Sequence, residues 1–141
     1  MFFGNYATSL DEKGRVHIPA VLAKQVGDNE IMMVSDWGQC IAAFPPASFE
    51  AMGKRLHELS RDPKLRDRVH RTVSSFFECT IKNGKLLIPQ ELRSLKKLEK
   101  KVSIVGMLEH IEIWNHGDWR NRETERGASG IRDDLNELGI L

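Results

Sequence analysis

The chain alternates short apolar runs with charged or glycine-containing turns, and this alternation predicts a fixed order of strands and helices. Apolar and polar residues alternate on both sides of a charged turn in which Gly14 supplies a positive φ angle. Pro19 then marks the start of a helix that stops at Gly27. The expected elements of this first part are strands at 6–10, 16–18, 30–34 and 39–44, and a helix at 20–26.

The same order is written a second time. DEKGRVHIP at 11–19 is matched by KNGKLLIP at 82–89, with the two glycines, Gly14 and Gly84, 70 residues apart. Asn83-Gly84 is a strong hairpin signal. The expected elements are a helix at 90–98 with Leu92, Leu95 and Leu98 as its apolar stripe, strands at 101–106 and 110–114, and a tail helix at 118–126 that GASG interrupts at 127–130. The offset also pairs Ile18 with Ile88, Leu22 with Leu92, Ile41 with Ile111 and Phe44 with Trp114.

A helical region separates the two copies. A proline pair opens a helix at 46–60, and a second helix follows Pro63 with Leu65, Val69 and Val73 facing inward. Each copy therefore has the order ββ, helix, ββ, helix, with strands too short for an isolated hairpin to bury a core. The sequence predicts an α+β fold in which the halves complete one another's sheets. The alternative is two halves that fold independently, as separate beads on one chain. The tail at 131–141 has apolar residues at helical spacing, and we expect it to become ordered only when it packs against a partner.

Total charge does not identify a partner, but its distribution is informative. The chain has 141 residues, with 21 lysines and arginines against 20 aspartates and glutamates. Segments 54–71 and 82–101 each have seven basic residues, against three and two acidic ones, whereas 109–137 has four arginines and eight acids. Cys40 and Cys79 lie in apolar surroundings, which favours buried, reduced thiols. No basic leader or membrane-length apolar run is apparent, so a cytoplasmic protein is expected.

Residue patterns for catalysis are absent from the sequence. The five histidines have no metal-ligand spacing with one another or with cysteine, and no nucleophile elbow or phosphate loop occurs. Glu109 and Glu112 are at odd spacing on a predicted strand and would face opposite sides. We therefore expect no enzyme activity, no cofactor, no metal and no small-molecule substrate.

The charged turn is the main candidate site. A two-stranded ribbon with a glycine turn fits a DNA major groove. The planar guanidinium fork of Arg15 can donate hydrogen bonds to two acceptor atoms of one guanine. Lys13, Lys82 and Lys85 suit phosphate contacts, while Asp11 is expected to orient Arg15 or hold the turn that Gly14 forms. The alternative is an ordinary hairpin tip with a weak surface ion pair. Arg61, Lys64, Arg68 and Arg71 form a basic helical stripe, which is either a solvated face or a subunit or phosphate contact.

The sequence resembles the MraZ family of bacterial transcriptional regulators. The resemblance lies in D-x-x-x-R at 11–15 followed by VHIP, and in the segments MFFG, RVHR, GKLLIP and IEIW, and it covers about residues 1–126. It implies a double swapped-hairpin, AbrB-like β-barrel, with modules at 1–70 and 71–126 and a tail at 127–141. The second copy departs from the D-x-x-x-R pattern, with Ile81 at the aspartate position and Lys85 at the arginine position. This leaves open whether the second turn contacts DNA.

The resemblance also implies a function. Such a protein would be a nucleoid-associated homo-oligomeric ring that binds double-stranded DNA upstream of its own operon, in the division and cell wall gene cluster. Tandem DNA boxes suit a head-to-tail ring. Two alternatives remain open at this point, an AbrB-like antitoxin subunit with a toxin partner and an oligomeric scaffold that binds other proteins.

Overall fold

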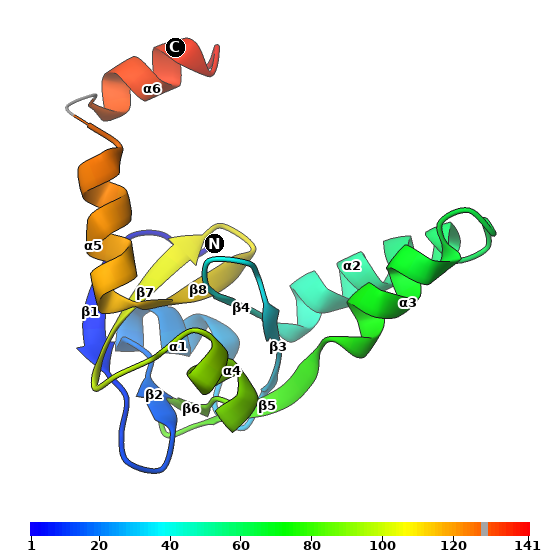
Figure 1. Cartoon of the computed structure of the whole chain (residues 1–141), viewed down its shortest axis with the longest axis horizontal. Helices are drawn as coiled ribbons and strands as arrows, with labels where there is room; N and C mark the ends of the chain where they lie inside the picture. Colours follow the sequence, from blue (N-terminus) through cyan, green and yellow to red (C-terminus); the bar gives the residue numbers. More distant parts are fainter. Residues whose placement is uncertain (128–129) are drawn as a thin grey trace.

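The computed structural model describes residues 1–127 and 130–141. Its elements are β1 (Asn5–Ser9), β2 (Arg15–His17), α1 (Ala20–Val26), β3 (Ile31–Asp36), β4 (Ile41–Phe44), α2 (Pro46–Leu59), α3 (Arg66–Ser74), β5 (Phe77–Lys82), β6 (Lys85–Leu87), α4 (Gln90–Leu95), β7 (Lys101–Met107), β8 (His110–Asn115), α5 (His116–Glu125) and α6 (Ile131–Glu137). The strands form a compact body, from which the α2 and α3 pair projects as an arm and α5 extends on another side (Figure 1).

All strands belong to one antiparallel sheet that nearly closes on itself. Their order is β1-β7-β8-β4-β3-β5-β6-β2, and an isolated bridge between Leu10 and Val16 joins the two ends. Closure leaves few unpaired backbone groups at a sheet edge. The predicted α+β class with a β-barrel flanked by helices is confirmed.

The two copies exchange strands, as predicted from strands too short to bury a core within one copy. In the first copy, β1 pairs with β7 of the second, with Tyr6 opposite Ile104. In return, β5 of the second copy pairs with β3 of the first, with Met32 opposite Cys79. The pairs β2/β6 and β4/β8 lie between the copies. The alternative of two independent beads is therefore wrong, because neither copy has a complete sheet without the other.

The core occupies the interior of this barrel and follows the repeat. Equivalent residues of the two copies are buried together, which explains why the interior pattern is duplicated. The repeat-related pairs in the core are Val16 and Leu86, Ile18 and Ile88, Leu22 and Leu92, Ile41 and Ile111, and Met32 and Val102. Cys40 and Cys79 are free and buried, as predicted, and burial raises their thiol pKa values to about 12 and about 11.

The prolines before α1 and α4 have nearly the same backbone angles, φ −52° and ψ 139° at Pro19 and φ −53° and ψ 140° at Pro89. Each is the N-cap, directly before helices that start at Ala20 and Gln90 as expected. The Pro19 carbonyl accepts the first helical hydrogen bonds of α1. The predicted stripe on the second helix is wrong at Leu95, which is exposed. Helix α4 ends there, and Lys97 with φ +53° turns the chain away.

The arm departs from the predictions in two details. Val69 is buried as expected, but Val73 is exposed, and the base of the arm is closed instead by an edge-to-face contact between Phe49 and Phe76. The predicted basic stripe is not one helical face. Its first two members precede α3, in the turn after α2, and all four side chains are exposed.

The tail helix starts earlier than expected because the Asn115 side chain caps α5. Its oxygen accepts a hydrogen bond from the backbone N–H of Asp118 at 3.1 Å.

The predicted interruption at 127–130 includes 128 and 129, which lie outside the described residues. The tail forms helix α6, and Ile131 and the C-cap residue Leu138 are both exposed. That its order depends on a partner stays a prediction. Over the described residues, no helix is both long and apolar enough to cross a bilayer.

Candidate nucleic-acid interface

The first turn is a hairpin with a three-residue loop. The backbone N–H of Asp11 donates to the Arg15 carbonyl at 2.9 Å, and that of Gly14 donates to the Asp11 carbonyl at 3.0 Å. Gly14 has φ +84°, as predicted, a conformation that side chains with a Cβ rarely adopt. The loop therefore has a defined shape, with Lys13 exposed at its tip.

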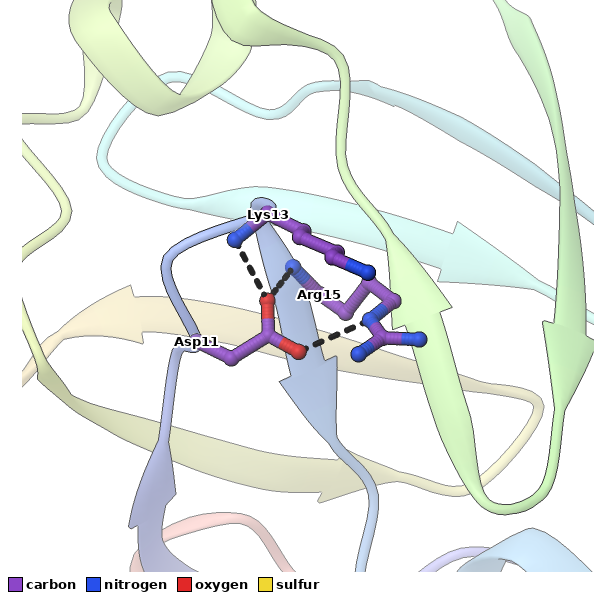
Figure 2. A network of polar contacts seen from close by, with 3 residues as sticks. All are labelled: Asp11, Lys13 and Arg15. Carbon is purple, nitrogen blue, oxygen red and sulfur yellow. Dashed lines mark hydrogen bonds and ion pairs between the residues drawn. The ribbon is translucent and has the colours of Figure 1, made fainter.

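The carboxylate of Asp11 organises this turn (Figure 2). Its Oδ1 accepts the backbone N–H groups of Lys13 and Arg15, both at 2.9 Å, and its Oδ2 accepts Nε of Arg15 at 2.7 Å. Within residues 1–127 and 130–141, the two terminal guanidinium nitrogens form no hydrogen bond. The ion pair thus holds Arg15 by one nitrogen and leaves its fork available, while the side chain remains 41% exposed.

These contacts set the ionisation of Asp11. The hydrogen bond from the Arg15 backbone is the largest cause, followed by the Arg15 side chain and its charge and then the Lys13 backbone, and together they hold the Asp11 pKa below its ordinary value of 3.8. A lowered pKa means that the ionised carboxylate stabilises the turn above about pH 4, and that this contribution is lost as the pH falls through the lowered pKa.

We expect NMR to detect this loss directly. The Arg15 Nε–H signal should hold its position from pH 7 to pH 4 and move only when Asp11 protonates below its ordinary pKa. Asp11→Asn, which cannot ionise, should show no such transition. An Asp11 carboxyl titrating at or above 3.8 would contradict the assigned role.

The second turn is one residue shorter than the first. Lys82 pairs with Lys85, and only Asn83 and Gly84 lie between them, with φ +52° and +72°. This is the two-residue loop that Asn-Gly predicts.

The shorter loop changes which residues of the two turns correspond to each other. Ile81 pairs with Leu86 as Leu10 bridges Val16, so the structural counterpart of Asp11 is Lys82 and not Ile81. Ile81 is 1% exposed and belongs to the core. A constant offset of 70 residues assumes loops of equal length, and it fails by one residue before the turn. The counterpart of Arg15 is Lys85, as expected.

A distant carboxylate stabilises the second turn. Asp28, between α1 and β3, accepts the backbone N–H of Asn83 on Oδ1 at 2.8 Å. Its neighbours add backbone bonds, from Asn29 N–H to the Ile81 carbonyl and from Ile81 N–H to the Glu30 carbonyl, both at 2.9 Å. Sequence reasoning missed Asp28 because 55 residues separate it from its partner.

The two turns are braced through one ribbon, the strand pair β2 and β6. Ile18 N–H donates to the Gly84 carbonyl at 2.7 Å, and Ile88 N–H donates to the Gly14 carbonyl at 3.0 Å. Each turn is therefore fixed by the strand end of the other copy. Such bracing limits the ordering entropy that a bound ligand would have to overcome.

The outward face of this ribbon carries two of the four basic residues predicted to contact DNA, Arg15 and Lys85. Because Val16 and Leu86 point inward, their neighbours point outward, with Arg15 opposite Leu87 and His17 opposite Lys85. A groove of about 610 Å³ on this side is lined by Arg15, Lys82 and Lys85, together with Asn29, Glu78, Cys79, Thr80, Asn83, Leu87 and Pro89. Lys13 and Asp11 are not among its lining residues and belong to the first turn at its end.

Arg93 is a basic residue that sequence reasoning did not select. From α4, its guanidinium packs on the first turn, where a Cβ added to Gly14 would lie 2.4 Å from Arg93 Cζ, and its Nε donates to the Ile88 carbonyl at 2.9 Å. The repeat places Ala23 at the equivalent position, so this cation supports only the first turn. Arg93 thus adds a third cation to the first turn, beside Lys13 and Arg15.

The geometry of this surface is compatible with binding to nucleic acid. Rigid β-turns carry one guanidinium and several ammonium groups along a two-stranded ribbon, which is narrow enough for a major groove. Across the described parts of the chain, no three histidine, cysteine, aspartate or glutamate side chains group as metal ligands would.

Several proteins of similar sequence have the same name. The family model described as "MraZ protein, putative antitoxin-like" matches residues 1–72 and 77–136. Proteins named transcriptional regulator MraZ are 31% identical in Finegoldia magna, over 99% of this chain and all of the relative, and 35% identical in Lactiplantibacillus plantarum, over 97% and 96%. A third, from Natranaerobius thermophilus, is 32% identical over 99% of this chain and all of the relative. With a swapped-hairpin barrel, a braced D-x-x-x-R turn and relatives that match along their full length, the chain belongs to the MraZ family of transcriptional regulators.

Proposed function

We propose that this chain regulates transcription by binding repeated DNA boxes upstream of its own operon as a ring-shaped homo-oligomer. The genes controlled would be those of the division and cell wall cluster, and the site of action would be the nucleoid in the cytoplasm. The observation that carries the proposal is the guanidinium of Arg15, which Asp11 holds at the end of a stiff ribbon and which lines one groove with Lys82 and Lys85. Arg15 would read a base edge and the lysines would contact phosphates.

Self-association is supported by unpartnered apolar surface. The first residues and the β7–β8 turn are joined by the Phe2–Leu108 bridge, and Met1, Phe3, Met107 and Leu108 are all exposed there. Contiguous apolar patches of this kind are typical of protein interfaces. One ribbon touches few phosphates, and copies in one assembly would raise avidity by roughly 10² to 10⁴ without a new type of contact.

A toxin-binding role is the second candidate, favoured by the antitoxin-like description of the family model. The interleaved sheet argues against the simplest form of it. Both halves of the barrel come from one chain, so no second chain is needed to close it.

The full-length protein should be tested against DNA from upstream of its own gene and against a scrambled fragment of equal composition. At about 150 mM salt we expect at least ~10³-fold tighter binding to the upstream fragment. Footprinting should show evenly spaced protected boxes, and light scattering should give the mass of a closed oligomer. Equal affinity for both fragments would overturn the proposal.

A further inference from the structure

The repeat preserves the inside of the central ribbon and changes its outside. Val16 and Leu86 are equivalent and both fully buried. On the outward face, the equivalent residues differ in chemistry, since Arg15 corresponds to Lys85 and His17 to Leu87. One end of the ribbon therefore presents a guanidinium opposite an isobutyl group, and the other end an ammonium group opposite an imidazole.

Leu87 is the unexpected member of this face. It is 52% exposed, although Leu86 and Ile88 on either side are fully buried and fix the backbone. A single exposed leucine is common and indicates nothing by itself. Leu87, however, lines the same 610 Å³ groove as Arg15, Lys82 and Lys85. An aliphatic side chain on a fixed backbone thus lies among the cations proposed to contact DNA.

We infer that Leu87 is a second specificity residue, which contacts the 5-methyl group of a thymine next to the base read by Arg15. The inference rests on the proposed function. The thymine methyl is the only apolar group that the bases display in the major groove, and aliphatic side chains read it by contact. Directly opposed side chains in an antiparallel pair have Cβ atoms about 5 Å apart, and base pairs are stacked about 3.4 Å apart. Arg15 and Leu87 therefore suit neighbouring base pairs.

This pairing gives the ribbon a direction. The guanidinium and the apolar group lie at the first turn, which Arg93 also supports, and the other end offers Lys85 and His17. Because the two ends of the outward face differ in chemistry, the ribbon would bind a DNA box that has no internal two-fold symmetry. Boxes of that kind, repeated in one direction, match copies arranged head to tail.

The test removes single methyl groups from DNA. In one box of the upstream fragment, each thymidine is replaced in turn by deoxyuridine, and binding of the full-length protein is measured. At one position we expect about fourfold weaker binding, equivalent to ~0.8 kcal/mol for one buried methyl group. Leu87→Ala should bind the normal box about fourfold more weakly than the wild type and should no longer distinguish the two bases at that position.

His17→Ala is the matched control, because it truncates the equivalent residue at the other end of the ribbon. It should keep the full methyl dependence. Circular dichroism should show that both variants are folded. Specific binding without methyl dependence at any position, or methyl dependence that survives in Leu87→Ala, would overturn the inference alone. Loss of all preference for the upstream DNA in the wild type would overturn the proposed function as well.

Discussion

Replacing Arg15 by alanine should abolish most discrimination between the upstream boxes and scrambled DNA. A bidentate contact to guanine contributes about 1–3 kcal/mol, or roughly 5-fold to 150-fold for each box read. Several copies acting on repeated boxes would multiply this loss. Fluorescence anisotropy with both fragments gives the ratio of affinities directly.

Two variants separate base reading from general attraction. Arg15→Lys keeps the positive charge but lacks the planar fork, so it should lose discrimination nearly as fully as alanine. Lys82→Ala should instead weaken binding to both fragments alike and lower the salt slope by about one. If Arg15→Ala weakened both fragments equally and lowered the slope in the same way, Arg15 would be a phosphate contact and not the base reader.

Gly106→Ala should have the largest effect on stability. A Cβ at this position in β7 would lie 2.4 Å from Phe3 N and 2.5 Å from Phe2 C, which are backbone atoms that cannot rotate away. The N-terminal segment would have to leave, with its Gly106 N–H to Gly4 carbonyl bond at 2.8 Å and the side chain of Phe2, which is 5% exposed. We expect a loss of about 2–4 kcal/mol, measured by thermal or urea unfolding at fixed protein concentration.

Gly53→Ala provides a matched control. Gly53 lies within α2, and an added Cβ would meet nothing within 4 Å, so alanine should stabilise by up to about 1 kcal/mol. A second check uses Phe2→Ala, whose cost should be much smaller in the Gly106→Ala background because the contact is already lost. Unchanged stability of Gly106→Ala would show that the N-terminal crossing is not fixed in solution.

The positions of most elements followed from local pattern. Alternating apolar residues, the Asn83-Gly84 dipeptide and the prolines before α1 and α4 act within a few residues, so they could be read without the fold. Errors arose where neighbours from elsewhere decide. Leu95 and Val73 have helical spacing with buried residues, but whether such a residue is covered depends on what packs against it, and both are exposed.

The site was predictable to a similar extent. The side chain of Asp11 acts on Lys13 and Arg15, two and four residues away, and the sequence indicated this pairing before the fold was known. Asp28 and Arg93 reach the turns from elsewhere in the chain, and no local signal marks them.

Hydrophobic periodicity and turn chemistry are local properties, so the duplicated module, most of its strands and helices and much of its interior could be read from the sequence alone. The fold was needed to establish that β1 pairs with β7 and β5 with β3. It was also needed to place Ile81 in the core, Lys82 at the position equivalent to Asp11, and Leu87 opposite Arg15. Strand register across the barrel is set by the combined packing of distant segments, and a difference of one residue in a loop changes which side chains face outward.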